Sequence, residues 1–168
     1  MNSPFASGVF PEPGECFRTG GRTVTETDIV QFAALTGDMH PQHTDAAWAS
    51  RSHFGSRIAH GMLLLSYALG LVPLDPERVV ALRRLSDAVF KRPVHIGDTV
   101  HIEGRIESIK AIDEHLALVR SHWRILNQDS LVVAHARLEL LMRHARDATH
   151  AAAQGHTMDN DRPSRMMA

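Results

Sequence analysis

The sequence has little cysteine and little net charge. Its 168 residues include one cysteine, Cys16, so the chain cannot form a disulfide within itself. A single thiol fits a reducing compartment, and we expect a cytoplasmic protein. Lys and Arg number 18 against 19 Asp and Glu, which leaves no excess of basic residues. We therefore expect neither nucleic acid nor an anionic membrane as a partner.

Long hydrophobic runs are also missing. The longest run, Met62 to Leu74, is interrupted by Ser66 and Gly70 and is too short to cross a bilayer. The segment Met1 to Pro13 has neither the basic start nor the apolar centre of a signal peptide. We interpret the hydrophobic run as a helix buried in the core of the protein.

The chain has the length of one domain. With 168 residues and 43% hydrophobic content it can form a single core. Residues 1–14 contain three prolines and two glycines without periodicity, and we expect a flexible N-terminal arm. Residues 15–144 contain the patterned segments of a single domain. Residues 145–168 have no pattern, and we expect a disordered C-terminal tail.

Start and stop signals predict helices in the first half of the domain. A weakly alternating segment over 16–24 predicts a first strand. Thr25 to Asp28 is typical of a capping box, and the helix that follows ends at Gly37. An apolar helix is predicted from about Gly61 to Val72, where Pro73 stops it.

A short helix is predicted over 46–51, with Asp45 as its N-cap. Its Trp48 is predicted to face inward. Together with Phe54, this tryptophan is interpreted as a core residue or as part of a lid over a pocket.

The second half of the chain changes to strand periodicity. Strands are predicted over 79–90, 100–107, 115–126 and 131–142, the second of which alternates cleanly between apolar and polar residues. Successive strands without intervening helices favour an antiparallel sheet. The fold class is therefore α+β, with the sheet wrapped around the apolar helix.

One stretch combines an acid with an imidazole. Asp38 and His43 lie five positions apart on a segment that Gly37 and Pro41 should keep from forming a regular helix, so both can point into one cavity. Gly61 begins the apolar helix, whose free N–H groups and positive dipole end would face the same cavity. This pattern indicates an acid, a base and an oxyanion site.

Three segments carry a family resemblance: Ala33 to His43, Phe54 to Met62, and Phe90 to Thr99. Their strings A-A-L-T-G-D-M-H-P-Q-H, F-G with I-A-H-G-M, and F-K-R-P-V with G-D-T stand in an order and spacing that resemble the MaoC-like family of (R)-specific enoyl-CoA hydratases. The resemblance covers roughly residues 17–142.

The resemblance implies a hotdog fold and a homodimer or a dimer of such dimers. It implies hydration of a trans-2-enoyl thioester, or dehydration of an (R)-3-hydroxyacyl thioester in reverse. Neither a metal nor another cofactor is implied. The acyl group would be carried by coenzyme A or by an acyl carrier protein.

The resemblance also assigns roles to residues. Asp38 and His43 match the catalytic pair, and Gly61 matches the residue whose N–H holds the thioester carbonyl. The expected substrate contacts are His40, Phe54, His60, Met62, Lys91 and Arg92. Of these, His60 is favoured as a structural residue below the site, and Lys91 and Arg92 as contacts of the carrier's phosphates.

This chain departs from the family at His40, where members commonly carry Asn in a Gly-Asp-x-Asn-Pro-x-His string. An imidazole can donate and accept hydrogen bonds as an amide does, but it titrates near neutral pH. Either His40 replaces the amide in holding the loop, which we favour, or the pocket chemistry or the substrate differs.

Three other functions compete with hydration. Asp38, His40, His43 and Asp45 are four potential ligands of a metal-dependent hydrolase, although no second cluster completes the shell. A hotdog thioesterase would use the same pocket to activate water toward the carbonyl carbon. A subunit that binds or assembles around acyl thioesters without turnover is the third alternative.

Overall fold

The structure is a computed structural model, which describes residues 3–6 and 10–144. The predicted C-terminal tail lies outside the described residues. Within them, the chain forms four helices and six strands: β1 (Cys16–Arg18), β2 (Arg22–Thr23), α1 (Glu26–Thr36), α2 (Pro41–Thr44), α3 (Ala46–Arg51), α4 (Gly61–Leu71), β3 (Val79–Phe90), β4 (Thr99–Ala111), β5 (Leu116–Leu126) and β6 (Val132–Arg143).

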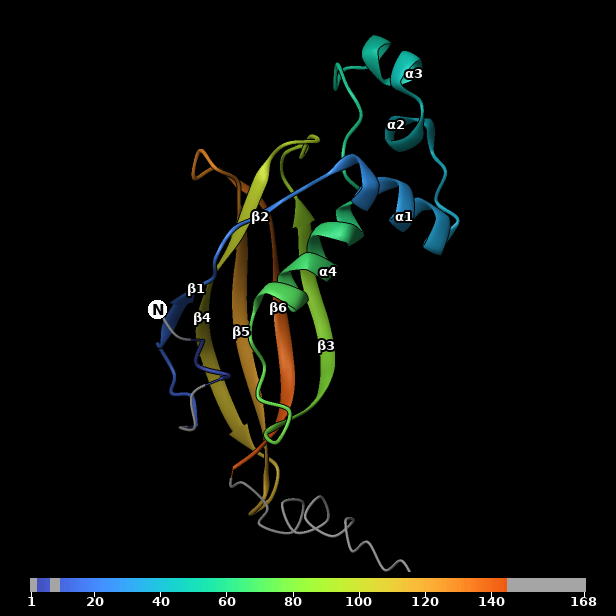
Figure 1. The fold of residues 1–168 in the computed structure, drawn as a ribbon. Coiled ribbons are helices and arrows are strands. Elements are labelled where there is room, and N and C mark those ends of the chain that lie inside the picture. Colours follow the sequence, from blue (N-terminus) through green and yellow to red (C-terminus); the bar gives the residue numbers. More distant parts are fainter. Residues whose placement is uncertain (1–2, 7–9, 145–168) are drawn as a thin grey trace, which may run out of the picture.

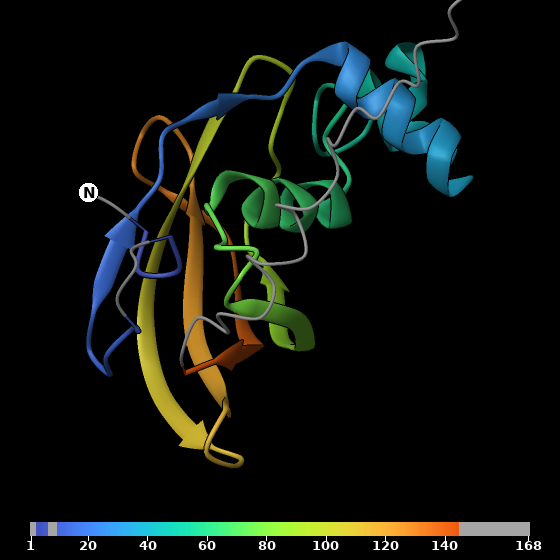
Figure 2. The ribbon, with the colours of Figure 1, turned by 60° about the horizontal axis from the view of Figure 1, so that its bottom comes forward.

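The strands form one antiparallel sheet in the order β1-β4-β5-β6-β3, and β2 pairs with the start of β4. The sheet curves around α4, while α1, α2 and α3 gather beyond one end of that helix (Figures 1 and 2). The predicted α+β class and hotdog fold are therefore confirmed.

Helix α4 is buried mainly on the side that faces the sheet. Leu63, Leu64 and Tyr67 belong to the core, but Met62 is 55% exposed. The prediction of a buried helix is therefore correct for one face only. On the other face, Met62 lines the pocket described below.

The helix α1 begins and ends as predicted. The Asp28 N–H donates to the Thr25 hydroxyl (3.2 Å), and the Thr25 N–H donates to the Asp28 carboxylate (2.8 Å). Gly37 ends the helix in the left-handed region, with φ of 78°. Because that conformation is easiest for glycine, the chain turns sharply and Asp38 follows directly beyond the helix.

The segment after Asp38 differs from the prediction. Pro41 does not prevent helix there; it is the first residue of the one-turn helix α2. A proline is tolerated at this position because the N–H it lacks would have no partner inside the helix.

Two further predictions are corrected by the structure. The strand predicted over 16–24 is divided into β1 and β2, with Gly20 and Gly21 between them. Trp48 does not face the core: it is 38% exposed and lies edge-on against the ring of His40. The six-residue helix α3 buries Ala49 instead.

Part of the expected flexible arm is packed against the core. The side chain of Phe5 is fully buried and lies 5.6 Å from the ring of Phe17 and 6.1 Å from that of Trp123. The Phe5 carbonyl also accepts a hydrogen bond from the Asp75 N–H (2.8 Å). The description of a loosely held arm is therefore wrong at Phe5, because burying this ring removes a large apolar surface from water.

In the part of the chain that the structure describes, no helix has the length and apolarity that crossing a membrane would need.

The packing of Phe17 depends on a glycine in the neighbouring strand. Phe17 pairs with Gly104 of β4, and its ring is perpendicular to that of Trp123. A Cβ added at Gly104 would lie 2.2 Å from the Phe17 ring, far inside contact distance. The ring therefore occupies the space that any other residue at position 104 would fill.

We expect Gly104→Ala to lower the free energy of unfolding by roughly 1–3 kcal/mol, the typical cost of overpacking a core. Urea denaturation measures this change. The control is Gly20→Ala, since a Cβ there meets no atom within 4 Å. Equal stability of the two variants would contradict the role given to Gly104.

Candidate active site

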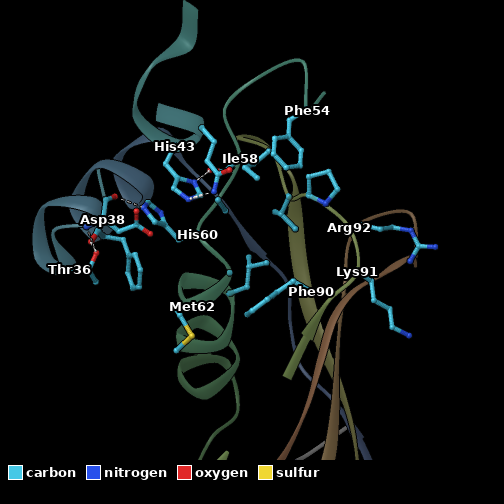
Figure 3. A pocket seen from close by; sticks show the side chains of 17 residues that line it. Thr36, Asp38, His43, Phe54, Ile58, His60, Met62, Phe90, Lys91 and Arg92 are labelled. Carbon is cyan, nitrogen blue, oxygen red and sulfur yellow. Dashed lines mark hydrogen bonds between the residues drawn. The ribbon is translucent and has the colours of Figure 1, made fainter. Parts of the chain in front are cut away.

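A pocket of about 540 Å³ lies where the α1–α2 loop, the start of α4 and the segment after β3 meet. Eight of the nine predicted site residues line it: Asp38, His43, Phe54, His60, Gly61, Met62, Lys91 and Arg92. Figure 3 shows Asp38, His43 and His60 on one side of the pocket, with Phe54 and Phe90 across from them. The ninth residue, His40, does not line the pocket.

His43 is held at both ring nitrogens. Its Nδ1 lies 2.7 Å from the Ile58 carbonyl oxygen, and its Nε2 lies 2.9 Å from the amide nitrogen of Gln42. A carbonyl can only accept, so Nδ1 carries the proton and Nε2 keeps a lone pair in the neutral ring. Burial lowers the pKa of His43 below its ordinary value of 6.5, and nearby His60 lowers it further. The hydrogen bond to Ile58 acts in the opposite direction and raises this pKa.

His60 stacks on His43 and also holds the loop of Asp38. The two imidazole rings lie 3.7 Å apart at an angle of 22°. The Nε2–H of His60 donates to the backbone carbonyl of Asp38 (3.0 Å). Its Nδ1 is buried and has no hydrogen-bond partner among the described residues. His60 thus contacts both members of the predicted acid and base pair, as the structural interpretation expected, and it lines the pocket as well.

The Asp38 carboxylate remains exposed at the pocket. It accepts a hydrogen bond from the His40 N–H (3.3 Å), which fixes the loop next to it. One carboxylate oxygen of Asp38 and one ring nitrogen each of His43 and His60 lie within 4.8 Å of one another. The acid and the imidazole predicted from the sequence therefore meet in one place.

Gly61 begins α4 at the pocket wall. Its N–H has no acceptor among the residues that the structure describes. A Cβ at this position would lie 2.8 Å from the ring of Phe90, so glycine allows that ring to cover the start of the helix. An oxygen atom of a ligand could accept the free Gly61 N–H where the positive end of the helix dipole also points.

The four potential metal ligands predicted near His43 are not assembled as a site. His40 Nδ1 accepts from the Gln42 N–H (3.2 Å) at the start of α2, and the Asp45 carboxylate accepts from the Trp48 N–H (2.9 Å) at the start of α3. Both side chains are helix caps. The interpretation that His40 holds the loop in place of an asparagine is supported by this bond.

The cluster of Asp38, His43 and His60 has a geometry that is poor for one metal ion. A lone pair of imidazole lies in the plane of its ring, so two rings that bind the same ion must have planes that meet at the ion. The rings of His43 and His60 are stacked and nearly parallel, at 22°. They would have to unstack before both could bind.

Lys91 and Arg92 lie at the opposite wall and are exposed. Figure 3 shows both side chains pointing away from His43 and Asp38. Arg92 donates to the carbonyl of Val132 (2.6 Å). Any contact of these cations with a ligand would therefore occur at the edge of the pocket.

Gln42 and Phe90 are among the residues that line the pocket without having been predicted as site residues. Gln42 directly precedes His43 in α2, and neighbouring residues of a helix do not usually face each other, so spacing could not identify it. Phe90 is the last residue of β3 and was read as part of that strand.

The environment of His43 predicts its titration. Because burial lowers its pKa, the imidazole should stay neutral at neutral pH and become protonated only below 6.5, the ordinary value. Protonation then favours the unfolded chain, so the contribution of His43 to stability should be lost as the pH falls below that value. NMR titration of labelled histidine measures the midpoint, and His43→Gln identifies the resonance by its loss. A midpoint above the ordinary value would contradict this environment.

Comparison with known proteins gives relatives that match this fold. The chain is 41% identical over 92 residues to Protein MaoC of Klebsiella aerogenes, covering 54% of this chain and 28% of that protein. It is 40% identical over 82 residues to an (R)-specific enoyl-CoA hydratase of Rhodospirillum rubrum, covering 47% of this chain and 55% of that protein. The chain thus spans about half the length of the second relative and less of the first.

A solved structure of an R-hydratase also resembles this chain. The R-hydratase PhaJ1 from Pseudomonas aeruginosa superposes with a TM-score of 0.66 at 31% identity, over 86% of this chain and 87% of that one. A profile of the family described as MaoC like domain matches residues 9–122. This match includes all nine predicted site residues, and the chain belongs to the MaoC-like domain family.

Proposed function

We propose that this protein is a hydro-lyase that adds water to trans-2-enoyl thioesters to form (R)-3-hydroxyacyl thioesters, or removes it in reverse. The observation that carries this proposal is the meeting of Asp38 and His43 in a pocket where Gly61 begins α4. The hydratase names of the relatives support the same reaction class.

The distance between the acid and the imidazole suits one water molecule. Two hydrogen bonds of about 2.8 Å that meet at a tetrahedral water span about 4.6 Å. A carboxylate oxygen of Asp38 and a ring nitrogen of His43 lie no more than 4.8 Å apart. A single water could therefore bond to both groups at once when it takes the place of the Gln42 amide at Nε2 of His43.

Hydration then requires two proton movements. As the water oxygen bonds to the β-carbon, one group of the pair takes a proton from that water, and the other supplies a proton to the α-carbon. The product gains the hydroxyl and one hydrogen, so the atoms of one water are accounted for. The neutral state of buried His43 makes its Nε2 able to accept a proton.

Charge develops on the thioester oxygen as the β-carbon is attacked. The free Gly61 N–H and the positive end of α4 would stabilise that charge. A single donor of this kind is worth about 10²–10³ in rate in other enzymes. No metal ion is needed for this step, because the amide and the helix end supply the positive field.

The thioester is carried by coenzyme A or by an acyl carrier protein. Lys91 and Arg92, at the pocket edge, are our candidates for contacts with the carrier's phosphates. Phe54 and Met62 line the pocket and present apolar surface to the acyl group or the carrier arm.

Removing either reacting group should abolish hydration. We expect Asp38→Asn and, separately, His43→Gln to lower the turnover of crotonyl-CoA by about 10²–10⁴-fold, the usual contribution of a general acid or base. Loss of the enoyl thioester absorbance measures the rate.

The matched control is Asp45→Asn, because Asp45 caps α3 outside the pocket and Asn caps a helix equally well. Near-normal turnover in either site variant would refute the assignment. A thiol reagent added to the wild-type assay separates the competing functions. Released thiol indicates a thioesterase, whereas absence of both thiol release and loss of the enoyl absorbance indicates a subunit without turnover.

We also propose a homodimer formed through β3. This strand is at the end of the sheet, and its outer edge has no strand partner within the described residues. It exposes five large apolar side chains, at 39–48% each: Val80, Leu82, Leu85, Val89 and Phe90. A long edge strand of this kind invites pairing with another strand. Phe90 also lines the pocket, so such an interface would lie beside the site.

A charge on this strand should disrupt the dimer. We expect Leu85→Glu to sediment as a monomer and the wild type as a dimer in analytical ultracentrifugation. Leu131→Glu is the control, since Leu131 has a similar exposure of 46% but lies outside β3. A wild-type monomer, or dissociation in both variants, would disprove this interface.

A further inference from the structure

The Nε2 atom of His43 has one hydrogen-bond partner among the described residues, the side-chain amide of Gln42. Nδ1 is occupied by the Ile58 carbonyl, so Nε2 is the nitrogen at which the ring can gain or lose a proton. Gln42 therefore bonds to the atom that would exchange a proton in the proposed reaction.

Gln42 is itself held in place by the residue that departs from the family pattern. Its backbone N–H donates to Nδ1 of His40 (3.2 Å), which caps the one-turn helix α2. The backbone of Gln42 is thus tied to one imidazole while its side chain bonds to another. Helix α2 therefore fixes the position of the amide that bonds to the His43 ring.

A carboxamide can serve both protonation states of an imidazole. With the neutral ring, its N–H donates to the lone pair on Nε2, as in the structure. After the ring has gained a proton, Nε2 becomes a donor, and rotation of the amide brings its oxygen to accept that N–H. The side-chain oxygen of Gln42 forms no hydrogen bond among the described residues that would oppose this rotation.

Other groups around His43 affect its charge without bonding to Nε2. His60 and His40 disfavour the protonated ring, and the Asp38 carboxylate favours it. Lys91 and Arg92 lie across the pocket and point away. In a buried site, a protonated ring without an acceptor at Nε2 is costly.

We propose that Gln42 is a positioning residue that holds Nε2 of His43 on either side of proton transfer: its amide nitrogen donates to the neutral ring until the reacting water takes that place, and its amide oxygen accepts the N–H of the protonated ring afterwards. This inference rests on the proposed function, since it gives His43 a proton to exchange. It adds a residue whose side chain acts through His43 and need not touch the substrate.

Two substitutions separate this role from a merely structural one. Gln42→Met keeps an unbranched side chain of similar length but cannot bond to Nε2. Gln42→Glu keeps an acceptor and adds a charge that favours the protonated ring. Gln31→Met, on the exposed side of α1, is the matched control.

NMR titration of His43 gives a readout that does not depend on turnover. Because a bond to the charged ring is stronger than one to the neutral ring, we expect the midpoint to fall by about one pH unit in Gln42→Met. We expect it to rise by about one unit or more in Gln42→Glu. Gln31→Met should leave the midpoint unchanged. The acidic limb of kcat/KM for crotonyl-CoA should shift in the same order.

An unchanged midpoint in Gln42→Met, or a midpoint that rises, would overturn the proposal. A change in KM or stability alone would show a structural role and would also overturn it. Failure of the proposed function is distinguishable, since the wild type would then not hydrate crotonyl-CoA, or Asp38→Asn would hydrate it as fast as the wild type, whatever the histidine titration shows.

Discussion

The stacking of His43 on His60 is the interaction on which the site depends. Each ring is fixed by a backbone carbonyl, that of Ile58 for His43 and that of Asp38 for His60. The bond of His60 joins the residue before α4 to the loop after α1, 22 positions away, and the bond of His43 joins α2 to the segment that precedes α4. The ring pair therefore sets where the acid lies relative to the first amide of the helix.

Burial gives this arrangement its chemical character. His43 is 4% exposed and His60 is 2% exposed, so both rings are desolvated while the Asp38 carboxylate remains open to the pocket. In His43, whose pKa is lowered by burial, desolvation disfavours charge on the ring and preserves a lone pair for accepting a proton. Near-parallel stacking also keeps the two rings from converging on a metal ion. The same packing thus suits the acid and base roles that we propose and opposes metal binding.

The sheet positions the other side of the pocket. Wrapping β3 to β6 around α4 brings Phe90, at the end of β3, over Gly61, where a side chain at residue 61 would collide with the ring. Since β3 is also the exposed edge of the sheet, the apolar surface beside the pocket is continuous with the strand that we propose as the dimer interface.

Local patterns predicted much of this protein because short-range rules govern them. The capping box at Thr25, the stop at Gly37 and the bounds of β3 depend on neighbouring residues, and all were predicted. Trp48 was placed wrongly because a six-residue helix lacks enough turns to reveal which face is buried. Phe5 was assigned to a loose arm because its partners, Phe17 and Trp123, lie far along the chain.

The sequence by itself determined the fold class, the family and the pairing of Asp38 with His43, since spacing and motif order carry that information. Only the tertiary structure decided what surrounds the pair. The stack with His60, the bond from Gln42 to Nε2 and the helix-capping role of His40 follow from ring planes and lone-pair directions. Those directions are set by packing between distant segments, and residue spacing does not encode them.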